Sequence, residues 1–269
     1  MCIRDRASLR TKAEKDGDHY IVNGHKIWTT LAQYADWMFC LVRTRSDGKP
    51  QEGISFLLID MNTPGIEVKP IITVDGGHEV NEVFLEDVKV PVENLVGEEN
   101  MGWTIAKFLL GNERTGIAGV ARSKKAIDRL KEIANSELNN GEPLMNDASF
   151  NKKITELEVD LTALEFTELR TLAKESQGEG PGAESSILKI KGTEIQQKIS
   201  ELTLEAIGNY ASPYITPLSV RNFGSNYLEV GPEHTQGVAQ NYFGMRKTSI
   251  YGGSNEIQRN IIAKMVLGL

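Results

Sequence analysis

The chain has 269 residues, with 37 Asp and Glu against 30 Lys and Arg, and a formal net charge of -7. This acidic balance argues against nucleic-acid binding, because binding to phosphates needs an excess of cationic side chains. Its longest apolar runs, such as residues 37–42, are far too short to cross a bilayer, so no membrane span is expected. Two cysteines make neither a disulfide framework nor a zinc site, which predicts a cytoplasmic protein without a metal centre.

The first part of the chain is typical of β structure. Residues 1–6, Met-Cys-Ile-Arg-Asp-Arg, look like a non-native start and are left out of the fold prediction. Asn23-Gly24 lies between two apolar segments and predicts a hairpin, because this pair supplies the positive φ angles of a type I′ turn. Apolar runs bounded by turn residues predict further strands at residues 37–42, 54–59, 66–70, 80–85 and 88–92.

From residue 98 the apolar period becomes helical. Three- and four-residue spacings predict helices through residues 117–134, 150–164 and 187–206, the last one after a glycine-rich linker at 177–182. A final helix begins near Ser254. It is expected to bury Ile257, Ile261, Met265 and Leu269.

These elements predict an α+β protein with two domains. Residues 7–97 are expected to form part of an antiparallel β-barrel, because no helical segment separates the strands. Residues 98–269 are expected to form an all-α, up-down four-helix bundle.

Trp28-Thr29-Thr30 is the first segment that could carry chemistry. An aromatic ring and two hydroxyl groups could pack beside a planar cofactor and donate hydrogen bonds to it. The alternative is a buried strand tryptophan with β-branched neighbours.

Glu113 and Arg114 form the second candidate, in a helical stretch that also holds Gly111 and Asn112. Gly and Asn each cost a helix about 1 kcal/mol or less, so a break with a packing or functional reason is expected there. A carboxylate beside such a break could act as a base with a raised pKa. The alternative is a solvated Glu113–Arg114 ion pair.

The third candidate is the segment 251–256, which contains Gly252 and Gly253 before Ser254. Two glycines let the backbone approach a ligand closely, and serine is a good N-cap. The positive end of the final helix suits a phosphate or an electron-rich ring edge. A plain turn with a helix cap is the alternative.

Together, and in this order, the three segments resemble acyl-CoA dehydrogenases over residues 7–269. The resemblance is carried by residues 16–30, 53–60, 91–102 and 251–259, and it is strongest for the pimeloyl-CoA dehydrogenase large-subunit type. It implies a β middle domain, a carboxy-terminal helical bundle and FAD between them. The implied reaction converts an acyl-CoA thioester to the trans-2-enoyl-CoA and passes electrons to electron-transfer flavoprotein.

The resemblance also implies residue roles. Trp28 would pack on the flavin ring, while the Thr30 hydroxyl and backbone amides would reach its N5 and pyrimidine edge, and Thr29 belongs to the same cofactor-binding motif. Ser254 and Glu256 match positions that contact FAD, often from a neighbouring subunit. Gly253 and Arg114 would contact the acyl-CoA.

The catalytic base is implied at Glu113. Most members carry a glutamate directly after the tyrosine of the Tyr-Glu-Gly motif, where this chain has Gly252. Isovaleryl- and long-chain-type members carry it on an earlier helix, at the position that matches Glu113. Gly252 then clears space for that carboxylate.

The chain also departs from the family pattern. The amino-terminal helical domain and the first barrel strands are missing, the Arg-x-Phe-Gly segment has no match in residues 135–151, and the Gln-x-x-Gly-Gly pattern is weakened at 205–209. We therefore expect a truncated chain that is inactive alone and a homo- or hetero-oligomer in which a second subunit completes the flavin site. The alternatives are a non-catalytic structural subunit and an acyl-CoA oxidase.

Overall fold

The structure is a computed structural model that describes residues 8–178, 182–213 and 230–269, apart from the side chains of residues 110–115 and 117. It divides into two compact units. The sheet unit consists of residues 1–73 and 78–111, and the helical unit of residues 74–77 and 112–269. No helix in the described ranges is both long enough and apolar enough to cross a membrane.

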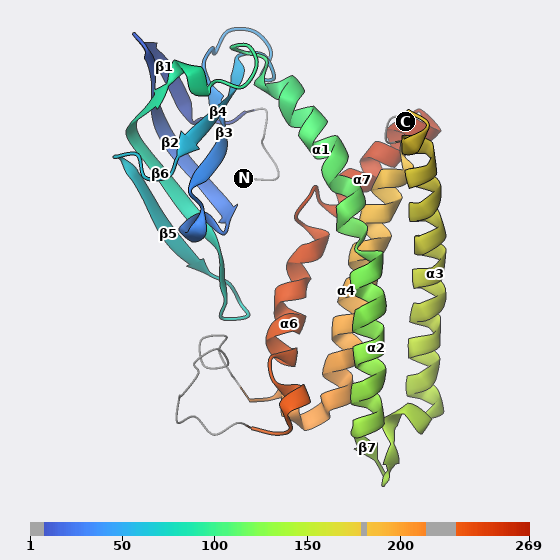
Figure 1. Ribbon diagram of the computed structural model, residues 1–269. Coiled ribbons are helices and arrows are strands. Elements are labelled where there is room, and N and C mark those ends of the chain that lie inside the picture. The colour runs from blue at the N-terminus through green and yellow to red at the C-terminus, as the bar shows by residue number, and fades with distance from the viewer. Residues whose placement is uncertain (1–7, 179–181, 214–229) are drawn as a thin grey trace. The chain divides into compact units, whose positions relative to one another are not determined.

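The sheet unit is built on a 6-stranded sheet with the order β4-β3-β1-β2-β6-β5 (Figure 1). The strands are β1 (Lys12–Asp16), β2 (His19–Thr30), β3 (Trp37–Arg43), β4 (Ile54–Asp60), β5 (Ile66–Ile72) and β6 (His78–Pro91). Neighbouring strands are antiparallel, except that β1 meets β3 in parallel at Lys12 and Arg43. The strands predicted at residues 37–42, 54–59 and 66–70 are confirmed.

The hairpin predicted at Asn23-Gly24 is wrong. Strand β2 continues through this pair, and the turn lies instead at Gly17-Asp18, where Asp16 pairs with His19. Gly24 is needed for another reason: a Cβ there would lie 2.6 Å from the Cα of Thr11. Glycine at position 24 therefore allows the segment around Thr11 to pack closely against β2, and the Asn-Gly pair does not form a turn.

The two strands predicted at residues 80–85 and 88–92 are one strand, β6. The pairing of β6 with β2 shifts between Leu85 and Val88, and Asp87 takes a φ of 49°. The Asp87 amide donates to the Asn23 side chain over 2.8 Å, so a β-bulge joins the two apolar runs where a break was expected.

The helical unit contains α2 (Val120–Ser136), α3 (Ala148–Ser176), α4 (Glu184–Ile207), α6 (Val238–Met245) and α7 (Asn255–Ile262), and α1 (Gly102–Ala118) leads into it. Helices α2, α3 and α4 pack on one another, and α6 and α7 pack against α4 (Figure 1). The predicted seam of α3 is confirmed, since all its members are buried: Phe150, Ile154, Leu157, Leu161 and Leu164. The helix predicted through residues 117–134 is broken at Gly119, whose φ is 62°.

The prediction of which residues the last helix buries is wrong. Helix α7 begins after Ser254 as expected, but Ile257 is 50% exposed, Met265 61% and Leu269 81%, and Ile261 is only partly buried. The buried members of α7 are Asn255 and Gln258. Polar groups on α4 hold this face of α7, so apolar spacing gave the wrong side.

Asp147 is the N-cap of α3, and its carboxylate accepts the amides of Ser149 and Phe150, each at 2.9 Å. We expect Asp147→Ala to lower the free energy of unfolding by about 0.5–2 kcal/mol, because two amide donors lose their partner. Urea unfolding measures this difference. Asp160→Ala, on the exposed side of the same helix, is the control, and an equal loss in both variants would contradict the capping role.

Candidate functional site

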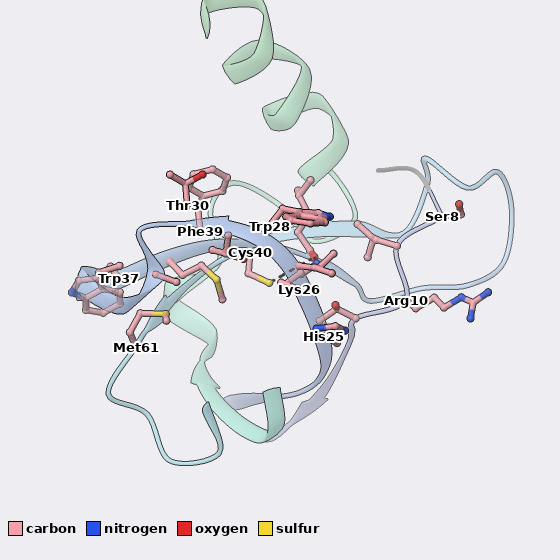
Figure 2. Close-up of a pocket in the computed structure, with 18 residues that line it drawn as sticks. Ser8, Arg10, His25, Lys26, Trp28, Thr30, Trp37, Phe39, Cys40 and Met61 are labelled. Atoms are coloured by element: carbon pink, nitrogen blue, oxygen red, sulfur yellow. Dashed lines mark hydrogen bonds between the residues drawn. The ribbon is translucent and has the colours of Figure 1, made fainter. Parts of the chain in front are cut away.

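A cavity of about 580 Å³ opens in the sheet unit between β2 and β3 (Figure 2). Strand β1 pairs with β2 only from His19 to Asn23, so the later half of β2 faces β3 across a gap. The lining comes from residues 25–30 of β2, residues 37–41 of β3 and residues 8–11. Trp37 and Met61 lie at one end in Figure 2, and Arg10 and Ser8 lie at the other.

Trp28 lies in a β-bulge at this cavity. The pairing of β2 with β6 shifts between Lys26, opposite Val83, and Thr29, opposite Asn81. Trp28 takes a φ of 62°, which is uncommon for an aromatic residue, and its side chain is 48% exposed. The alternative of a buried strand tryptophan is therefore wrong, and Trp28 lines the cavity.

Thr29 lines the same cavity; its carbonyl oxygen accepts a hydrogen bond, and its side-chain hydroxyl lacks one among the described residues. Its carbonyl accepts a 3.1 Å hydrogen bond from Nδ2 of the buried Asn81. Its Oγ1 is buried and has no hydrogen-bond partner among the described residues. Such a group costs about 1–3 kcal/mol, which a ligand that bonds it would relieve. The contact of Thr29 with a cofactor stays a prediction.

Asn81 supports the bulge and was missed by the sequence analysis. Its Nδ2 also donates to the side chain of Gln33 over 2.6 Å, and its Oδ1 lies 2.6 Å from Nε2 of His78. The sequence gives no clear signal for it, because Asn81 stands next to another polar residue in Val80-Asn81-Glu82-Val83. Thr30, the third predicted residue of this group, is exposed at the cavity.

The wall of the cavity includes Lys26 and Cys40. The Lys26 Nζ donates to the carbonyl of Leu41 over 2.7 Å and so connects β2 to β3. Burial raises the pKa of the Cys40 thiol, which keeps this side chain protonated and apolar in character.

In the helical unit, the predicted glycine segment forms a tight turn before α7. Gly252 and Gly253 have φ angles of 63° and 82°, and a Cβ on Gly253 would lie 2.6 Å from Nε2 of Gln258. The backbone conformation therefore favours glycine at position 253, and a Cβ there would also displace the Gln258 amide.

Ser254 and Glu256 form the expected cap. The Ser254 hydroxyl accepts the Ile257 amide at 3.5 Å. The pKa of Glu256 is lowered by a hydrogen bond from its own amide and by another from the Ser254 hydroxyl. These contacts match the turn-and-cap alternative, and the contact of both residues with a cofactor stays a prediction.

A buried polar network beneath this turn was also missed. Lys189 of α4 is fully buried, and its Nζ donates to the Ser249 carbonyl at 3.1 Å and to Oδ1 of Asn255 at 2.7 Å. Burial lowers the pKa of Lys189 to about 8, against an opposing effect of Glu256. The side chain is therefore mostly charged at neutral pH. Its neighbours Leu188 and Ile190 are buried too, so spacing along α4 could not single it out.

Glu113 and Arg114 lie in α1, and their side chains are outside the described part of the structure. The break expected near Gly111-Asn112 is wrong, because α1 runs unbroken to Ala118 and the chain turns at Gly119. The roles of Glu113 as base and of Arg114 as an acyl-CoA contact stay predictions.

Known proteins match both parts of the chain. Residues 100–267 match the family described as acyl-CoA dehydrogenase, C-terminal domain, and residues 4–88 match acyl-CoA dehydrogenase, middle domain. Acyl-CoA dehydrogenase IpdE1 of Mycobacterium tuberculosis is 33% identical over 98% of this chain and 63% of its own length. Cyclohexane-1-carbonyl-CoA dehydrogenase of Syntrophus aciditrophicus is 32% identical over 97% of this chain and 64% of its own.

A solved structure is similar as well. The crystal structure of the ChsE4-ChsE5 complex from Mycobacterium tuberculosis superposes with a TM-score of 0.77 at 30% identity, covering 98% of this chain and 65% of that one. The chain thus spans less than two thirds of the length of each of these three proteins.

Proposed function

Because the chain belongs to the acyl-CoA dehydrogenase family, whose members are FAD-dependent flavoproteins, we propose that it takes part in α,β-dehydrogenation of an acyl-CoA thioester. The observation that carries the proposal is the Trp28 bulge, which brings to one cavity an aromatic ring and Thr29, whose hydroxyl has no hydrogen-bond partner among the described residues. The chain covers 63% of its relative IpdE1, so the activity proposed is that of the whole protein.

The residues at the cavity fit a flavin. The isoalloxazine ring is planar, with apolar faces and polar edges, and it needs an aromatic or aliphatic surface and a few hydrogen-bond donors. Trp28 supplies the surface, and the hydroxyls of Thr29 and Thr30 supply the donors. The cavity volume of about 580 Å³ is typical of cofactor sites. Ser254 and Glu256, at the start of α7, are the proposed contacts from the helical unit.

The chemistry divides between the cofactor and this chain. When bound, FAD supplies the hydride acceptor, its N5 atom. The Glu113 carboxylate takes the α-proton, while the β-hydrogen leaves with its electron pair and the trans-2-enoyl-CoA remains. Backbone N–H groups polarise the thioester carbonyl and so make the α-proton more acidic. Gly252 leaves space for the Glu113 carboxylate, and Gly253 and Arg114 hold the acyl-CoA.

The proposed partners are electron-transfer flavoprotein, which receives the electrons, and a second acyl-CoA dehydrogenase subunit. Residues 135–151 contain no cation to hold the FAD pyrophosphate, and the similar ChsE4-ChsE5 structure is a complex of two proteins. Purifying the intact protein with and without a second subunit tests this proposal. Full FAD occupancy of the homo-oligomer would contradict it.

The substrate class proposed is a dicarboxylic, alicyclic or steroid-side-chain acyl-CoA. The relative named cyclohexane-1-carbonyl-CoA dehydrogenase supports the alicyclic choice, so cyclohexane-1-carbonyl-CoA is the first probe. Anaerobic flavin reduction by this thioester is the expected result. Rapid peroxide formation in air would indicate an oxidase instead.

Thr29→Val is expected to have opposite effects on the two states. Without FAD, loss of the unpartnered hydroxyl should raise the free energy of unfolding by about 1 kcal/mol or more. With FAD, the same loss should weaken binding by roughly three- to tenfold, because one hydrogen bond is removed. Chemical unfolding and equilibrium FAD titration measure the two effects.

Ser123→Ala is the matched control, because Ser123 carries the other buried, unpartnered hydroxyl found among the described residues, and it lies on α2. This variant should gain stability and keep its FAD affinity. Unchanged FAD affinity in Thr29→Val would contradict the proposed flavin contact.

A further inference from the structure

The buried Lys189 has no part in the chemistry proposed above, yet it holds the segment that would meet the acyl-CoA. We propose that Lys189 is a positioning residue that fastens both ends of the turn 249–255 to α4 and thereby fixes Gly252 and Gly253 in the proposed site. The fastening stands on the contacts described here, and its consequence for ligand binding rests on the proposed function.

The two acceptors of the Lys189 Nζ lie at the two ends of the turn. The Ser249 carbonyl, 3.1 Å from the Lys189 Nζ, precedes the turn, and Oδ1 of Asn255, 2.7 Å away, follows it. One ammonium group therefore closes the turn at its base. Thr193 adds a second contact from α4, because the Nδ2 of Asn255 donates to its Oγ1 over 3.3 Å.

The middle of the turn is held separately. The Nε2 of Gln258 donates to the Gly252 carbonyl over 3.2 Å, and Oε1 of Gln258 accepts from the Ser186 hydroxyl over 2.8 Å. Ser186 and Gln258 are both buried. Positions 249, 252 and 255 are thus all connected to α4, although 60 or more residues separate each acceptor from its α4 partner.

The lysine at position 189 supplies more than side-chain volume. A methionine would fill nearly the same volume without the cost of burying a charge, so packing alone does not account for a lysine here. What lysine adds is three N–H donors on one atom. Two of them are used at the base of the turn, and Glu256 of α7 adds a favourable charge.

Lys189→Met in the full chain tests the fastening. Hydrogen exchange of the amides at residues 250–256 should become roughly ten- to a hundredfold faster, because hydrogen bonds to a charged group are lost while the helices remain folded. Lys191→Met is the matched control, since Lys191 lies on the same helix, is exposed and pairs with Glu194. Equal exchange in the Lys189 variant and the parent would overturn the proposal.

Asn255→Ala provides a second route, in case Lys189→Met does not fold. It removes the acceptor instead of the donor and should give a similar acceleration. Where both variants fold, the acceleration in the double variant should be smaller than the product of the two single effects, because Lys189 and Asn255 share one of their hydrogen bonds. Additive effects would overturn the assignment of Lys189 and Asn255 to one device.

FAD and acyl-CoA titrations then separate this proposal from the proposed function. A parent protein that binds neither ligand, with exchange in the Lys189 variant accelerated as expected, would contradict the function and keep the fastening. Accelerated exchange with unchanged binding of both ligands would overturn the positioning role. The expected result is accelerated exchange together with a roughly tenfold loss of acyl-CoA or FAD affinity, and no loss in Lys191→Met.

Discussion

Glu113→Gln is expected to lower the rate of acyl-CoA dehydrogenation by about 10²- to 10⁴-fold, the usual contribution of a positioned general base. Glutamine has the shape of glutamate but cannot accept the α-proton. Binding should change little, so kcat should fall while KM stays close to that of the parent. The measurement is flavin reduction by cyclohexane-1-carbonyl-CoA without oxygen, in the FAD-loaded protein with its second subunit.

A second readout isolates the proton step. In D₂O, a protein with a working base should exchange the α-hydrogen of a bound, non-oxidisable acyl-CoA, and Glu113→Gln should lose this exchange. Glu132→Gln is the control, because Glu132 is an exposed carboxylate that pairs with Arg129 on α2. Activity of Glu113→Gln near the parent's level would remove Glu113 as base and favour the non-catalytic subunit.

The predicted parts of the fold are those that a local pattern determines. The α3 seam was found because five apolar residues at three- and four-residue spacing must share one helix face, and Leu157 and its companions are buried as expected. The hairpin prediction at Asn23-Gly24 failed because distant residues determine the conformation of this pair. The Asn23 side chain accepts a hydrogen bond from the Asp87 amide, and Gly24 packs closely against Thr11. Such contacts leave no local signal.

The same division applies to the candidate site. Residue type and family resemblance predict Trp28, Thr29 and Thr30 as site residues, whereas the bulge that exposes Trp28 depends on the register between β2 and β6. Asn81 and Lys189 were missed because each acts on a segment far away in the sequence. Lys189 stands between Leu188 and Ile190 and Asn81 between Val80 and Glu82, and neither local pattern identifies the distant partner.

Gly192→Ala should destabilise the helical unit, although alanine is the better helix former. Alanine in a helix interior gains about 1 kcal/mol over glycine. At position 192, however, a Cβ would lie 2.6 Å from the carbonyl oxygen of Ala118 and 2.7 Å from its Cα. These are backbone atoms at the end of α1, so α1 or α4 must move, and overpacking of this kind costs about 1–3 kcal/mol.

Gly116→Ala is the matched control and should have the opposite sign, since among the described residues no atom outside the adjoining turns of α1 lies within 4 Å of the Cβ position at Gly116. We expect a gain of up to about 1 kcal/mol there and a net loss for Gly192→Ala, both measured by urea unfolding. Because Ala118 is five residues after Glu113, movement of this helix end should also lower kcat in Gly192→Ala. Equal stabilisation by both substitutions would show that α1 and α4 can move apart at the Gly192–Ala118 contact without an energetic cost. In that case kcat should stay at the parent's level.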